Sequence, residues 1–146
     1  MCTLKKVKTQ HMATSTTTKH WIARVLIAIV FAINMYCAVS FFFNPAAYVG
    51  AYQLDGEGAQ AALSGLGVTF AMWNATYIPI LVLPHRFRAV FAVVLAQQVI
   101  GLAGESWILS TLGASQAILA ASITRFIIFD AIGLVLLLIA FLISLK

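Results

Sequence analysis

Four long apolar runs follow one another along this chain, and they constrain its fold more than any other feature. They cover residues 21–43, 62–83, 87–104 and 122–145. A helix needs about 20 apolar residues to cross the roughly 30 Å hydrocarbon core of a bilayer at 1.5 Å per residue. The runs therefore predict an all-α fold, a bundle of four transmembrane helices. Pro79 lies inside the second run and predicts a kink there, because proline removes a helical hydrogen bond.

The composition excludes a soluble globular domain. Of the 146 residues, 62% are hydrophobic and only 9% are charged, whereas about a quarter of an ordinary soluble domain is charged. Four spans use most of the chain, so no room remains for a separate soluble catalytic domain. We expect a lipid bilayer, and not water, to surround most of the polypeptide.

The basic residues predict the orientation of the chain in the membrane. Four crossings place the N-terminal arm, the short turn near residue 85 and the C-terminus on one side, opposite Asp55 and Glu57. That side holds Lys5, Lys6, Lys8, Lys19, Arg24, Arg86, Arg88 and Lys146. Because cytoplasmic loops retain Lys and Arg, we predict that both termini are cytoplasmic. The partner of these charges is then anionic lipid and not nucleic acid, and we expect a bacterial cytoplasmic (inner) membrane.

The chain divides into a polar basic arm, residues 1–20, and a four-helix membrane domain, residues 21–146. The first run is longer than the roughly 7–15 residues of a signal-peptide core and lacks a small-x-small cleavage site, so we expect a retained span. The Ser/Thr-rich arm leaves two alternatives open. It resembles a transit peptide in its lack of acids, and Met12 could be the start in place of Met1.

Polar residues inside the predicted spans are the main candidates for function, because charged groups are costly in hydrocarbon. Asp130 is the principal one. Residues three or four positions apart share a helix face, which places Gln98 and Glu105 together on the third span. The residues at similar depth form a predicted polar layer of Asp130, Glu105, Arg125, Gln98, Asn74, Asn34 and Trp73.

Two interpretations of this layer are open. In the structural one, amides bond across helices, Glu105 and Arg125 form an ion pair near the outer surface, and Asp130 accepts hydrogen bonds from Asn or Gln. In the functional one, Asp130, Glu105 and their neighbours line a ligand or proton site. Arg125 lies about 140° round the helix from Asp130, so each needs a partner from another segment.

The sequence offers little metal or cofactor chemistry. Its histidines, His11, His20 and His85, lie away from the span centres, which disfavours haem, copper or iron ligation in the membrane. It contains no phosphate-binding loop, metal-spaced cysteine pair or plausible Ser-His-Asp set. We therefore assign no catalytic residue, no metal ligand and no cofactor, and we disfavour an enzyme.

The order of several short motifs resembles a known group of membrane proteins. WNATY lies in the second span, Arg86 and Arg88 open the third, VLAQQVIGLAGE runs through it, and Arg125 opens the fourth. Over residues 20–145 this layout resembles the small four-helix membrane proteins of the DoxX-like and BphX-like type. Such families include accessory subunits of quinone-linked oxidoreductases, so the resemblance implies an accessory role in the membrane. It implies no catalytic residue.

Two functions from different classes follow as hypotheses. The first is a noncatalytic accessory subunit that packs against larger membrane proteins or copies of itself, in a quinone-linked electron-transfer complex. The second is a small carrier or binding protein for a lipophilic or quinone-like molecule or a lipid, using the polar layer around Asp130. A membrane enzyme with Glu105 or Asp130 as acid or base is third. A cavity bordered by Asp130 and Gln98 favours the carrier, whereas tight closure by packed side chains favours the subunit.

Overall fold

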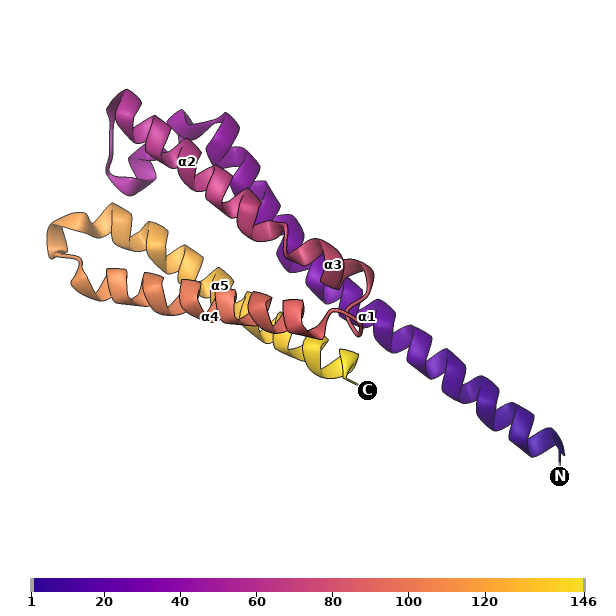
Figure 1. Ribbon diagram of the computed structural model, residues 1–146. Coiled ribbons are helices and arrows are strands. Elements are labelled where there is room, and N and C mark those ends of the chain that lie inside the picture. The colour runs from indigo at the N-terminus through magenta and orange to yellow at the C-terminus, as the bar shows by residue number, and fades with distance from the viewer. Residues whose placement is uncertain (1, 146) are drawn as a thin grey trace.

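The computed structural model describes the backbone of residues 2–145 and the side chains of residues 18–145. The α-helices in this range are α1 (Cys2–Phe43), α2 (Gly56–Asn74), α3 (Tyr77–Val82), α4 (Arg88–Thr111) and α5 (Ala117–Ser144). Short 3-10 helices lie in the loops: η1 (Pro45–Ala47), η2 (Val49–Tyr52) and η3 (Ala114–Gln116). The described backbone contains no strand, so the predicted all-α class is confirmed (Figure 1).

Among the residues that the structure describes, three helical segments are long and apolar enough to cross a membrane. They are Thr18–Phe43 within α1, Arg88–Thr111 and Ala114–Ser144, with mean hydropathies of 2.4, 1.5 and 3.0. These segments contain most of the first, third and fourth apolar runs. The membrane character predicted from the sequence is therefore confirmed, and the chain is a multi-pass membrane protein.

At the end of the bundle opposite the α3–α4 turn, α4 and α5 are longer than the sequence predicted. Because Glu105 follows Gly104, the third span was expected to end there, but α4 continues to Thr111. The hydroxyls of Ser106 and Ser110 each donate to a carbonyl of their own helix at 2.6 Å, which satisfies these polar groups without breaking the helix. The helix α5 likewise begins before residue 122.

The second apolar run is divided in two. The helix α2 ends at Asn74 and α3 begins at Tyr77. Pro79 has no N–H to give to the carbonyl of Ala75, and its ring crowds that carbonyl. The carbonyl of Ala75 instead accepts the N–H of Ile78 at 3.4 Å, a tighter turn than an α-helix makes. The kink predicted from Pro79 is confirmed, and it takes the form of a two-residue break.

The helices pack as two antiparallel pairs. In the first pair, α1 packs against α2 and α3, which follow one another along the chain. In the second pair, α4 packs against α5. The two pairs also meet, because α1 contacts α5. Figure 1 shows the pairs close together near the α3–α4 turn and spread apart toward the loops that carry η1, η2 and η3. One closely packed point joins the first pair, since a Cβ atom on Gly67 would lie 2.7 Å from the carbonyl oxygen of Ala38.

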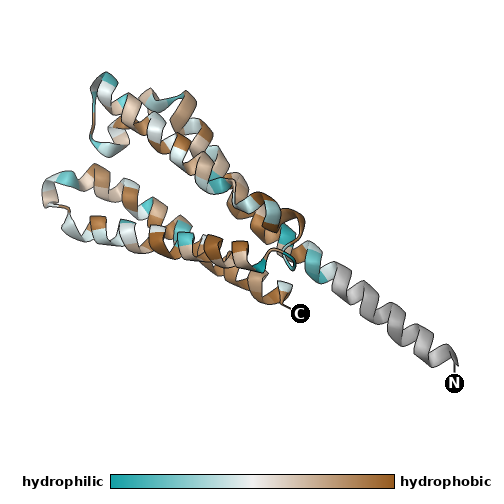
Figure 2. Cartoon of the chain, viewed as in Figure 1, coloured by the Kyte–Doolittle hydropathy of each residue, from teal (hydrophilic) through white to brown (hydrophobic). Residues whose placement is uncertain are grey.

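A closed apolar core fills the end near the α3–α4 turn. Its buried residues repeat at the three- and four-residue spacing of a helix face. They are Ala23, Ile27, Val30, Tyr77, Ile80, Phe91, Val94, Leu137 and Ala140. The outer faces are also apolar, as in Ile100, which is 68% exposed. Figure 2 shows hydrophobic residues along the helices and most hydrophilic ones near the turns, the pattern of helices that face lipid.

Two arginines at this end satisfy the carbonyls that helix ends leave unpaired. The guanidinium of Arg24 donates to the carbonyl of Val82 at the end of α3. That of Arg88 donates to the carbonyl of Ser144 at the end of α5, at 3.5 Å. A positive charge at a helix C-terminus is also favoured by the helix dipole. These bases, predicted only as membrane-surface charges, therefore also hold the ends of helices.

The predicted boundary between a polar arm and a membrane domain does not coincide with the start of a helix. The helix α1 runs through residue 20 without interruption. The side chains of residues 1–17, including Lys5, Lys6, Lys8 and His11, lie outside the described residues, as do Met1 and Lys146.

Candidate intramembrane ligand site

Each long helix directs at least one polar side chain toward the interior of the bundle. These residues continue the inward stripes of the apolar core, at the same three- and four-residue spacing. They are Asn34 on α1, Asn74 on α2, Gln98 and Glu105 on α4, and Asp130 on α5. The stripes thus change from apolar to polar as they pass from the α3–α4 turn toward the loops.

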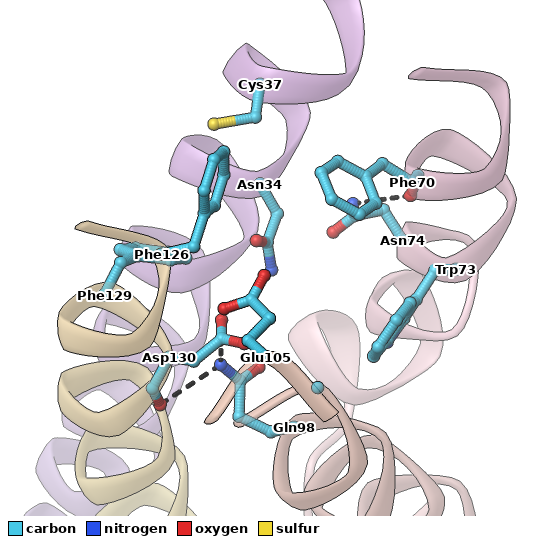
Figure 3. A pocket seen from close by; sticks show the side chains of 11 residues that line it. Asn34, Cys37, Phe70, Trp73, Asn74, Gln98, Glu105, Phe126, Phe129 and Asp130 are labelled. Carbon is cyan, nitrogen blue, oxygen red and sulfur yellow. Dashed lines mark hydrogen bonds between the residues drawn. The ribbon is translucent and has the colours of Figure 1, made fainter. Parts of the chain in front are cut away.

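These side chains surround a cavity of about 60 Å³ between α1, α2, α4 and α5. Figure 3 shows Asn34, Glu105 and Asp130 turned toward the same space. The residues that line it are Asn34, Cys37, Phe70, Trp73, Asn74, Gln98, Gly101, Glu105, Phe126, Phe129 and Asp130. The structure therefore brings the predicted layer together, with the exception of Arg125.

Gln98 and Asp130 form the best-defined contact of the cavity. The side-chain amide of Gln98 donates to Oδ1 of Asp130 at 2.8 Å and to its backbone carbonyl at 3.2 Å. The hydroxyl of Tyr77 donates to Oε1 of Gln98 at 3.4 Å. Gln98 is buried, so this pair joins α4 to α5 below the cavity, where hydrogen bonds between helices replace those that lipid cannot supply.

Two glycines make room for this pair. A Cβ atom on Gly101 would lie 2.9 Å from Oδ2 of Asp130. One on Gly133 would lie 3.1 Å from Nε2 of Gln98. Both distances are shorter than ordinary contacts, so larger residues at these positions would displace the polar side chains. Gly101 and Gly133 therefore serve the polar contact as well as helix packing.

Two acceptor atoms of the cavity are buried without a hydrogen-bond partner in the described part of the chain. They are Oδ1 of Asn74 and Oε2 of Glu105. Asn74 is only 2% exposed, and its amide group donates to the carbonyl of Phe70 at 2.7 Å, which leaves its own oxygen free. Buried polar atoms are nearly always paired. The cavity therefore offers acceptors that lack donors.

Aromatic rings close the cavity on its sides. Trp73 approaches from α2, its ring 3.6 Å from the Cβ position of Gly101, and Phe70, Phe126 and Phe129 complete the wall. The sequence prediction included Trp73 but not the phenylalanines. Spacing could have identified two of them, because Phe70 and Phe126 each lie four positions before a predicted polar residue.

Arg125 lies elsewhere, and the predicted Glu105–Arg125 ion pair is absent from the described residues. Arg125 lines a larger groove of about 500 Å³ between α1, η1, η2 and α5. The structural interpretation of the polar layer paired these two side chains, but they line different spaces. Cys37, Phe126 and Phe129 line both spaces and form the wall between them.

Within residues 18–145, no group of three or more His, Cys, Asp or Glu side chains is placed to hold a metal ion. No known protein family, curated protein or solved structure matches the chain.

Proposed function

We propose that this protein binds a small lipophilic molecule inside the membrane and holds its polar head in the cavity between α1, α2, α4 and α5. The observation that carries the proposal is the pair of unpartnered acceptors, Oδ1 of Asn74 and Oε2 of Glu105, on one cavity in a lipid-facing bundle. An unpaired buried acceptor is destabilising by about 1–3 kcal/mol. A ligand that donates hydrogen bonds removes this penalty.

The cavity selects the chemistry of the head group. Its lining presents carboxylate and amide oxygens, so a hydroxyl or ammonium head is complementary. Its volume of about 60 Å³ accommodates about two water molecules at roughly 30 Å³ each, or a head of a few atoms. A quinone ring is larger and its oxygens are acceptors. A long-chain alcohol or amine therefore fits this cavity better than the quinone-like ligand that the sequence left open.

We further propose that α2 and α3 together make one broken crossing, which completes four crossings with both termini cytoplasmic. The break at residues 75–76 is compatible with a span because Thr76 bonds to the carbonyl of Trp73 at 2.8 Å and to Gln97 at 3.1 Å. Arg24 and Arg88 lie at the α3–α4 end of the bundle, which supports that end as the cytoplasmic one. We likewise propose, from the sequence, a bacterial inner membrane and a relationship to the DoxX-like proteins.

The binding proposal takes precedence over the accessory-subunit hypothesis because of the cavity. A subunit that only packs against larger proteins has no use for unpartnered acceptors in its interior. Membership of a quinone-linked electron-transfer complex remains a prediction from the resemblance alone.

The test is binding of octadecylamine to the full chain in lipid nanodiscs. We expect saturable binding to the wild type and a loss of about tenfold or more in affinity for Glu105→Gln and Asn74→Leu, because each removes an acceptor. Glu57→Gln is the matched control, since it makes the same chemical change on an exposed carboxylate. Circular dichroism reports whether each variant folds. Equal affinity of Glu105→Gln and Glu57→Gln would reject the proposal.

A further inference from the structure

Arg125 is a charge within the apolar segment Ala114–Ser144. It lies eight residues into α5, which places its Cα about 12 Å along the helix from Ala117. Its side chain is exposed, and among the described residues it takes part in no hydrogen bond and no ion pair. The chain has only four acidic residues, and Glu105 and Asp130 point into the cavity on the other side of the phenylalanine wall.

The groove beside Arg125 is large and mostly apolar. It measures about 500 Å³, within the range of pockets for small molecules. Phe41, Phe126 and Phe129 supply aromatic surface, and Tyr48 and Tyr52 border it from the loop between α1 and α2. An apolar chain of a lipid is the natural content of such a surface.

The loop that borders the groove is fixed to α5. The side-chain amide of Gln53 donates to the carbonyl of Ser115 at 3.4 Å, and its oxygen accepts the N–H of Leu119 at 3.1 Å. Tyr52, the neighbour of Gln53, is half-buried, and burial is the main cause that raises its pKa to about 12. A tyrosine hydroxyl is protonated at neutral pH even at its ordinary pKa of about 10, so Tyr52 can donate a hydrogen bond.

An unpaired guanidinium at this depth is stabilised by a negative charge from outside the chain. Arginine in membrane spans is destabilising unless it is paired or reaches the interface. Its planar fork matches a carboxylate or phosphate with two parallel hydrogen bonds. The groove thus combines an apolar surface with one cation, the complement of an anionic amphiphile.

We propose that the groove binds the apolar chain of an amphiphile whose oxyanion head, a carboxylate or a phosphate, pairs with Arg125. This second site has the opposite charge preference to the cavity behind Cys37, Phe126 and Phe129. The two sites discriminate by charge: donors and cations enter the cavity, and anions occupy the groove.

The test compares stearate with methyl stearate, which has the same chain without the charge, on the full chain in zwitterionic nanodiscs. Stearate binds the wild type more tightly than methyl stearate, and Arg125→Gln lowers the affinity for stearate about tenfold or more. Arg125→Lys keeps the positive charge but loses the planar guanidinium. Its affinity for stearate therefore lies between those of the wild type and Arg125→Gln. Arg86→Gln, at the other end of the bundle, leaves the affinity unchanged.

Two further measurements keep the groove separate from the cavity. Ala51→Phe fills the groove and weakens binding of both stearate and methyl stearate, whereas Glu105→Gln changes neither. If phosphatidylglycerol competes with stearate for the groove, the oxyanion is the phosphate of a phospholipid. If phosphatidylglycerol does not compete, the oxyanion is a free carboxylate. Equal binding of stearate and methyl stearate, or unchanged stearate binding by Arg125→Gln, would overturn the proposal, whatever the result for octadecylamine.

Discussion

Inward-facing residues recur at the same three- and four-residue spacing at both ends of this bundle. One end is a closed core, however, and the other surrounds open space. Near the α3–α4 turn, the inward positions carry Ile27, Tyr77, Phe91 and Leu137, and the helices close into a buried core. Toward the η1–η3 loops, the same stripes carry polar residues, and the helix pairs spread apart (Figure 1). A cavity and a groove lie at this end.

The difference teaches which part of the chain supplies stability and which part supplies chemistry. Apolar side chains interlock at crystal-like density and tolerate little loss of volume. A buried amide or carboxylate needs a specific hydrogen-bond partner, and a space lies beside it where that partner is missing. The closed end therefore holds the helices together, and the open end contains the unpartnered acceptors on which the binding proposal rests.

The largest expected effect is on the closed end. Phe91→Ala removes a fully buried ring and lowers the free energy of unfolding by about 3–5 kcal/mol. Ile100→Ala on the outer face of the same helix changes it by less than about 0.5 kcal/mol. Denaturation in mixed micelles, followed by circular dichroism, measures both. Similar losses for the two variants would contradict the assignment of the core.

The contact between α1 and α2 is expected to be the next most sensitive. Gly67→Ala places a Cβ 2.7 Å from the backbones of Ala38 and Phe42, neither of which can move without separating the helices. We expect a loss of about 1–3 kcal/mol. Gly104→Ala on α4 meets no atom within 4 Å and is the control. If both alanines are tolerated equally, α1 and α2 do not pack as described.

At the open end, Gln98→Leu removes the donor that satisfies Asp130. We expect a loss of about 1–3 kcal/mol, because the carboxylate is left without its partner. Adding Asp130→Asn recovers part of this loss, since a neutral side chain is less costly to leave unpaired. A double-mutant cycle measures the coupling. Additive effects of the two substitutions would show that they do not interact.

The smallest expected effect on stability is that of Gly101→Ala. The new methyl meets Oδ2 of Asp130, the movable end of a side chain, so we expect a loss below about 1 kcal/mol. The same methyl narrows the cavity and weakens octadecylamine binding. Parallel measurements of unfolding and binding check this separation. A large loss of stability with unchanged binding would place the role of Gly101 in packing instead.

Local spacing predicted most of the fold and much of the candidate site. Apolar runs located most of the helices and Pro79 located the break. Helical spacing placed Gln98 and Glu105 on one face, and similar depth grouped Asn34, Asn74 and Asp130 with them. These features depend only on periodicity within a helix. They follow from the sequence without knowledge of how the helices pack.

The remaining features depend on geometry between helices. One of the two interpretations paired Arg125 with Glu105, because both lie near the outer ends of their spans. Their directions depend on the rotation of α4 and α5 about their axes and on how far each helix continues. The phenylalanine wall that separates cavity from groove follows from the same rotation. The hydropathy of the sequence does not predict this rotation.

The most direct test of the account is an NMR spectrum of the full chain in nanodiscs with octadecylamine bound. The head-group methylene should give nuclear Overhauser contacts to the rings of Trp73 and Phe126, which border the cavity. Contacts restricted to outward side chains such as Ile100 and Ile132 would show that the amine only dissolves in the surrounding lipid, and would contradict binding inside the bundle.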